Sequence, residues 1–163
     1  TPRQVCDSEV EATMRIAEEV RVLAICSSDA DCVALANIFS HSKWRLDCVR
    51  TCESGIQFLR ENDVPVVICS CDLPAGSWKT ILAEASSQPV PPRVIVASPE
   101  GGDELWSEVL AMGGYDVLAE PFYGPEVVRV VSLAWRQWKH EWEQTRRTQR
   151  AADRHGAAGG PRD

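Results

Sequence analysis

The stretch from Pro65 to Pro74 constrains the fold of this chain more than any other part; it reads Pro-Val-Val-Ile-Cys-Ser-Cys-Asp-Leu-Pro. Its apolar run, Val66 to Cys69, contains no polar residue and has a proline close to each end. A short unbroken run of this kind is typical of a strand buried on both faces of a parallel sheet. We therefore expect a sheet with helices on both sides.

Similar runs alternate with helix-like segments along most of the chain. Strands are expected at Arg21–Cys26, Trp44–Arg50, Pro65–Cys69, Arg93–Ala97 and Tyr115–Ala119. Helices are expected at Asp29–His41, Cys52–Asn62, Gly76–Ser86 and Gly101–Met112, and a long final helix begins near Gly124. This alternation predicts right-handed crossovers and an α/β three-layer sandwich around a parallel sheet.

Local signals support the ends of these helices. Ser28 with Asp31 three residues later forms a capping box, and Thr51 suits the N-cap of the next helix. Gly113-Gly114 predicts a left-handed cap at the C-terminus of the fourth helix.

With 163 residues and 44% hydrophobic content, the chain is large enough for one domain with flanking segments. We divide it into a lead-in over residues 1–19, with a short helix at Ser8–Glu19, and a domain over residues 20–138. An extension of the final helix follows over residues 139–150. The end, residues 151–163, is rich in Ala, Gly and Arg without an apolar period, so we expect it to be disordered.

Charge and composition exclude several classes of function. The net charge is −7, and the segment from Arg146 to Asp163 carries +3 (five Arg, two Asp), so about −10 falls on the rest. A body this acidic is a poor nucleic-acid binder. We find neither an apolar run long enough to span a membrane nor a secretory signal, and the seven cysteines are scattered in apolar segments. We expect reduced thiols and a cytoplasmic location.

The segment from Val20 to Trp138 resembles the receiver domains of bacterial two-component signalling. The residues that carry the resemblance are Val22–Ser27, Thr51–Leu59 with Gly55, the strand before Leu73-Pro74, Val94–Ser98, and Gly113–Phe122. The resemblance implies a flavodoxin-like fold with a five-stranded sheet in the order 2-1-3-4-5. It also implies a cis peptide bond between Glu120 and Pro121.

Receiver domains carry a phosphoryl-transfer site, and this chain differs from it at four positions. Where the family has two metal-binding acids, this chain has Cys26 and Ser27. The phosphoryl-accepting aspartate corresponds to Ser70, and the phosphate-binding lysine corresponds to Glu120. The family's hydroxyl is kept as Ser98.

Each of these differences removes a requirement of the reaction. A serine is a weak nucleophile without an activating base, and too few carboxylates are present to hold Mg²⁺. Glu120 would repel an incoming phosphoryl group. We expect a receiver-like domain that is not an enzyme, holds no metal or cofactor, and acts without phosphorylation. Ser70 and Ser98 would then be small polar fillers rather than modification sites.

Protein–protein contact is the function that remains for such a domain. Trp135, Trp138 and Trp142 lie on one heptad seam of the final helix, and the last two fall at or beyond the expected end of the domain. Exposed aromatics of this size usually bind a partner. The resemblance adds a dimer face on the fourth helix, fifth strand and fifth helix, which Trp106 would join. We expect a homodimer or an effector complex.

Two alternatives stay open from the sequence. The first is a receiver with residual phosphoryl switch chemistry, in which Asp29 or Asp72 serves as a relocated metal ligand. The second is a thiol-based redox or metal sensor on the same fold, built from Cys26, Cys69 and Cys71.

Overall fold

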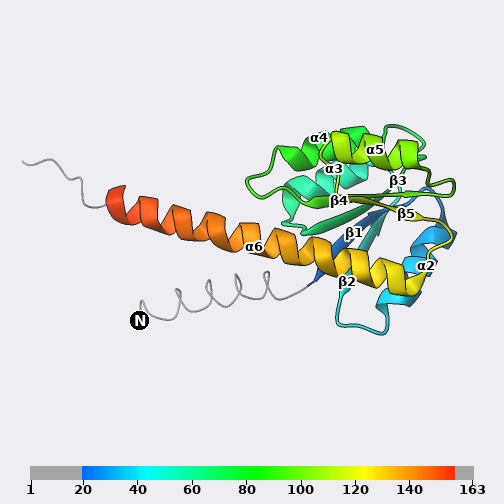
Figure 1. Cartoon of the computed structure of the whole chain (residues 1–163), viewed down its shortest axis with the longest axis horizontal. Coiled ribbons are helices and arrows are strands. Elements are labelled where there is room, and N and C mark those ends of the chain that lie inside the picture. The colour runs from blue at the N-terminus through cyan, green and yellow to red at the C-terminus, as the bar shows by residue number, and fades with distance from the viewer. Residues whose placement is uncertain (1–19, 157–163) are drawn as a thin grey trace, which may run out of the picture.

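Strands and helices alternate without exception in the computed structural model, which describes residues 20–156 (Figure 1). The elements are β1 (Arg21–Ile25), α2 (Asp29–Phe39), β2 (Arg45–Val49), α3 (Cys52–Glu61), β3 (Val66–Ser70), α4 (Trp78–Ser86), β4 (Arg93–Ser98), α5 (Asp103–Ala111), β5 (Asp116–Ala119) and α6 (Gly124–Gly156). The predicted strands and helices of this range are therefore present. The helix expected at Ser8–Glu19 lies outside the described residues.

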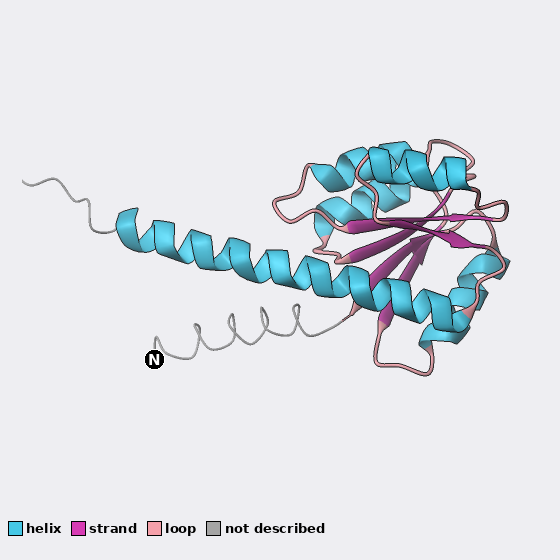
Figure 2. Ribbon diagram, in the orientation of Figure 1, coloured by secondary structure: helices cyan, strands magenta, loops and turns pink. Residues whose placement is uncertain are grey.

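The strands form one parallel sheet in the order β2-β1-β3-β4-β5, which confirms the flavodoxin-like topology (Figure 2). Strand β1 pairs with both β2 and β3, so that Val22 lies between Leu46 and Val66. All residues of β3 are buried, as its unbroken apolar run predicted. Strands β2 and β5 form the two edges of the sheet.

Helices cover both faces of the sheet and create two hydrophobic cores. Helices α2 and α6 pack on one face, where Leu35 and Val131 contact the core side chains of β1, β3 and β4. Helices α3, α4 and α5 cover the other face, where Leu59, Ile81 and Val109 belong to the core. Burial on both faces explains why the inner strands consist mainly of Val, Ile, Leu, Ala and Cys.

The expected helix caps are present. The Ser28 hydroxyl accepts a hydrogen bond from the Asp31 N–H at 3.3 Å, and the Thr51 hydroxyl accepts one from the Ser54 N–H at 3.1 Å. At the end of α5, Gly113 has a φ of +94°, in the left-handed region. At the start of α5, Gly102 is the N-cap residue and makes no side-chain cap hydrogen bond.

Helix α6 is 33 residues long and projects well beyond the sheet (Figure 1). It continues to Gly156, whereas we expected disorder from residue 151. Ala151, Ala152 and Arg154 are strong helix formers, which explains why the helix does not end earlier. No helix within residues 20–156 is both long enough and apolar enough to cross a membrane.

The expectation that Trp138 is exposed was wrong, because this side chain is only 2% exposed. Trp138 lies seven residues after Val131 and therefore on the same buried face of α6. Its ring stacks on Trp142, with centroids 5.9 Å apart. The packed part of α6 thus extends further along the helix than the sequence suggested.

Candidate functional site

The carboxyl ends of β1, β3, β4 and β5 meet at one edge of the sheet, where ligands of open parallel sheets usually bind. The resemblance assigns five residues to the site, and they follow or end these strands: Cys26, Ser27, Ser70, Ser98 and Glu120. The fold therefore places them at a common edge. The Glu120–Pro121 peptide bond, which follows β5, is cis.

Hydroxyl groups occupy the centre of this edge, and they bond to one another or to the backbone. The Ser27 and Ser70 hydroxyl oxygens are 3.2 Å apart, within hydrogen-bond distance. The Ser98 hydroxyl accepts a hydrogen bond from the Glu100 N–H at 3.2 Å. Ser70 and Ser98 are both 5% exposed. Buried hydroxyls with such partners fit the role of polar fillers.

Glu120 adds a carboxylate to this edge of the sheet. Its Oε1 atom is buried and has no hydrogen-bond partner among the described residues. Burial raises the pKa of Glu120, and the carboxylates of Asp31 and Asp72 raise it further. The negative charge of these groups disfavours a phosphoryl anion here.

A small recess remains between these side chains. Its lining includes Cys26, Asp31, Ser70, Glu120 and Phe122. The recess is too narrow to admit a water molecule. The side chains therefore fill the space at the ends of the strands.

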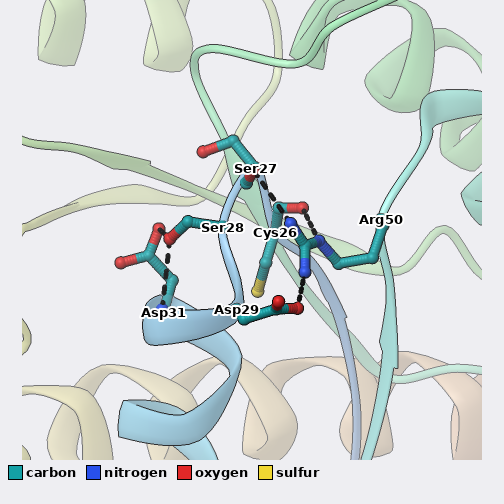
Figure 3. Close-up of polar contacts among 6 residues, drawn as sticks. All are labelled: Cys26, Ser27, Ser28, Asp29, Asp31 and Arg50. Carbon is teal, nitrogen blue, oxygen red and sulfur yellow. Dashed lines mark hydrogen bonds and ion pairs between the residues drawn. The ribbon is translucent and has the colours of Figure 1, made fainter.

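Arg50 fastens the loop between β1 and α2, a role that sequence reasoning missed. Its guanidinium donates to the carbonyl oxygens of Cys26 and Ser27, each at 3.1 Å, and forms an ion pair with Asp29 (Figure 3). We had assigned Arg50 only to the end of the second strand. No local pattern marks this contact, because it joins residues more than twenty positions apart.

The residues at this edge do not fit a magnesium ion. The neutral hydroxyls of Ser27 and Ser70 replace the carboxylates that such a hard cation needs, and Asp29 is paired with Arg50. Asp72 is exposed on the loop after β3. Within residues 20–156, no group of three His, Cys, Asp or Glu side chains is arranged to hold a metal ion.

The three cysteines that we expected to converge do not lie together. Cys69 pairs in register with Ile25, and both side chains lie in the core under α3, α4 and α5. Cys26, one residue after Ile25, points to the opposite face and packs in the core under α2 and α6. Alternation along a strand therefore separates Cys26 from Cys69, and Cys71 packs near Cys69.

Trp106 lies on the surface formed by α5, β5 and α6. Its side chain is 48% exposed, and its Nε1 donates to the Asp116 carboxylate at 3.2 Å. Together with Val117 of β5 and Glu126 of α6, it lines a shallow recess. This surface corresponds to the dimer face that the resemblance implied.

The seam on α6 is less accessible than expected. Trp135 and Trp142 are partly buried, and each has a cation over its ring: Lys139 at 5.1 Å and Arg146 at 4.7 Å, respectively. Trp138 is buried between them. The structure thus brings Trp106, not Trp138, to the surface.

Comparison with solved structures defines the class of fold. The signal receiver domain of a protein described as a Luxo repressor from Vibrio parahaemolyticus superposes with a TM-score of 0.70 at 23% identity, covering 76% of this chain and 95% of that one. The beryllofluoride-activated NtrC4 receiver domain dimer gives 0.67 at 19% identity, covering 72% and 98%. The receiver domain of a sensor histidine kinase from Pseudomonas aeruginosa PAO1, solved with a magnesium ion coordinated in its active-site cleft, gives 0.64 at 15% identity, covering 72% and 98%.

These similarities show that the chain has the three-layer fold of response-regulator receiver domains. Neither the family models nor the curated proteins include a match to this sequence.

Proposed function

We propose that this chain is a degenerate receiver domain that acts through protein–protein contacts and without phosphorylation, as part of a two-component-type regulatory protein. The observation that carries the proposal is the pair of hydroxyls, Ser27 and Ser70, 3.2 Å apart at the ends of β1 and β3. These positions correspond to a metal-binding acid and the acceptor aspartate of the family. Phosphoryl transfer there would require a metal and a carboxylate.

Glu120 supports the same conclusion from the opposite side of the site. In the family, a lysine at this position binds a phosphoryl oxygen. Here the carboxylate is partly buried, and Asp31 and Asp72 add negative charge around it. A phosphoryl group would enter a negative field with no metal ion to neutralise it.

Incubation with acetyl phosphate and Mg²⁺, followed by intact mass measurement, tests this proposal. An ordinary receiver domain treated in parallel serves as the positive control. We expect the mass of this protein to stay unchanged while the control gains one phosphoryl group. A phosphoryl adduct on this chain would support residual switch chemistry and refute the proposal.

The surface around Trp106 is our proposed interface. Trp106 and Val117 line its recess, and Leu133, on α6, is 42% exposed. Leu133 lies seven residues after Glu126, a lining residue of the recess beside Trp106, and therefore on the same side of α6. A half-exposed tryptophan and an exposed leucine that face the same side of the molecule are suited to an interface. One similar structure is itself a receiver domain dimer.

Sedimentation equilibrium tests whether this surface forms a homodimer. We expect the wild type to dimerise and the double variant Trp106→Ala, Leu133→Glu to raise the dissociation constant by about thirtyfold or more, as for the loss of a hot spot of about 2 kcal/mol. Val33→Ala is the matched control, because Val33 is 57% exposed but lies on α2. A wild type that stays monomeric, or equal masses for all three proteins, would refute a homodimer through this face.

A further inference from the structure

Three cysteines from different elements gather on the α2 side of the sheet. Cys48 of β2 pairs in register with Ala24 of β1. Cys26 stands two residues after Ala24 and therefore faces the same side, and its N–H donates to the Val49 carbonyl at 3.0 Å. Cys32 of α2 packs against the core that contains Cys26. We had not grouped these residues from the sequence.

The members of this cluster differ in exposure. Cys26 is only 4% exposed, Cys32 is partly buried, and Cys48 is exposed on the edge strand β2. All three thiols are free. Small oxidants in solution can therefore reach Cys48 first, because the other two thiols are less accessible.

The electrostatics of the cluster favour the same residue. Hydrogen bonding with the Cys26 thiol lowers the pKa of Cys48 to about 6, and Cys32 adds to this effect, against opposition from burial and Asp47. The interaction with Cys48, together with burial, raises the pKa of Cys26. Burial also raises the pKa of Cys32 and Cys71. A thiolate is the reactive form of cysteine, so the exposed member of the cluster is also the nucleophile.

We propose that Cys48, Cys26 and Cys32 form a peroxide-responsive modification site in which Cys48 is oxidised and one of its two neighbours completes a disulfide. The Cys48 thiolate attacks one oxygen of hydrogen peroxide, the O–O bond breaks, and hydroxide leaves and is protonated to water. The resulting sulfenic acid is then attacked by the Cys26 or Cys32 sulfur. The S–S bond forms, the S–O bond breaks, and the thiol proton leaves with the hydroxide as a second water.

This site shares Cys26 with the edge described above, but it does not depend on the proposed receiver function, since its chemistry uses the thiols of Cys26, Cys32 and Cys48 rather than the hydroxyls at the strand ends. Its expected reactivity is modest. At pH 7 the lowered pKa raises the thiolate fraction of Cys48, but the lower basicity of this thiolate reduces its nucleophilicity and offsets much of the gain. Buried thiols such as Cys69 are out of reach of oxidants in solution. They also stay protonated at pH 7, because burial raises the pKa of Cys69 to about 12.

Limited oxidation of the reduced full chain tests the proposal. The protein is treated with equimolar hydrogen peroxide, free thiols are alkylated, and disulfides are located by peptide mapping, with dimedone present in a parallel sample to trap sulfenic acid. The same measurements are made on Cys48→Ser and on the control Cys71→Ser. Circular dichroism checks that both variants are folded.

We expect one disulfide that joins Cys48 to Cys26 or Cys32, with dimedone bound at Cys48 in the parallel sample. The disulfide should be absent in Cys48→Ser, unchanged in Cys71→Ser, and reversed by dithiothreitol. The proposal is overturned if the disulfide excludes Cys48, if Cys48 pairs with any other cysteine, or if Cys48 is alkylated no faster than Cys71 at pH 7. A stable sulfenic acid without a disulfide would also overturn it.

Discussion

Replacement of Trp138 by alanine should be one of the most destabilising single changes in this domain. A buried tryptophan removes about 150–250 Å² from water, worth roughly 4–6 kcal/mol at 25 cal/mol per Å². Trp138 is 2% exposed, so nearly all of this area is involved. Two effects reduce this loss. The alanine side chain is itself buried and keeps part of the hydrophobic free energy. The variant also lacks the indole N–H, which has no hydrogen-bond partner among the described residues, and its removal offsets about 1 kcal/mol or more of the destabilisation. We therefore expect the free energy of unfolding to fall by about 3 kcal/mol.

Urea unfolding followed by far-UV circular dichroism measures this change without relying on tryptophan fluorescence. Trp106→Ala is the matched control, because it removes the same side chain from a position that is 48% exposed. The control should lose at most about 1 kcal/mol, while it weakens dimerisation. A Trp138→Ala variant that loses less than about 1 kcal/mol would contradict the burial of this residue and the packing of α6 beyond the sheet.

Three further predictions concern the edge of the sheet and its core. Arg50→Ala should destabilise the domain by about 1–2 kcal/mol, because the carbonyl groups of Cys26 and Ser27 lose a charged hydrogen-bond donor. Amide hydrogen exchange should become faster at Ser27, and an unchanged rate there would contradict the contact. Glu120→Gln should stabilise the domain. The pKa of Glu120 is raised in the folded state, so its ionised carboxylate destabilises the native protein once the pH rises above the ordinary pKa of 4.5. The stability gained by the variant, measured by thermal unfolding, should therefore be larger at pH 7 than at pH 4. An equal gain at both pH values would refute the buried carboxylate as its cause. Gly55→Ala should cost about 1–3 kcal/mol in urea unfolding, since a Cβ there would lie 2.5 Å from Ile25 Cδ1; a neutral effect would show that Ile25 moves away freely.

Much of the fold followed from local pattern. The unbroken apolar run of β3, the caps at Ser28 and Thr51, and the glycine pair at the end of α5 each report on a few adjacent residues. Such signals act through backbone geometry and burial on one segment at a time, and they placed each described strand and helix. The sheet order came from the resemblance and was confirmed by the structure.

The candidate site was predictable to the same extent. Because the carboxyl ends of parallel strands share one edge, the positions of Ser70, Ser98 and Glu120 followed from the strands themselves. The hydrogen-bond partner of each of these groups could not be predicted from the strands. The approach of Ser27 to Ser70 and the clamp formed by Arg50 depend on side-chain directions across neighbouring strands, which no short stretch of sequence specifies.

By itself, then, the sequence determined the alternation of elements and the chemical types of the groups at the strand ends. Only the tertiary structure decided which groups lie together: it buried Trp138, separated Cys26 from Cys69, and placed Cys26 on the same side of the sheet as Cys32 and Cys48. The physical reason is that secondary structure depends on the spacing of residues along the chain. Contacts between elements depend instead on how far each helix extends over the sheet and on which face each strand residue points to.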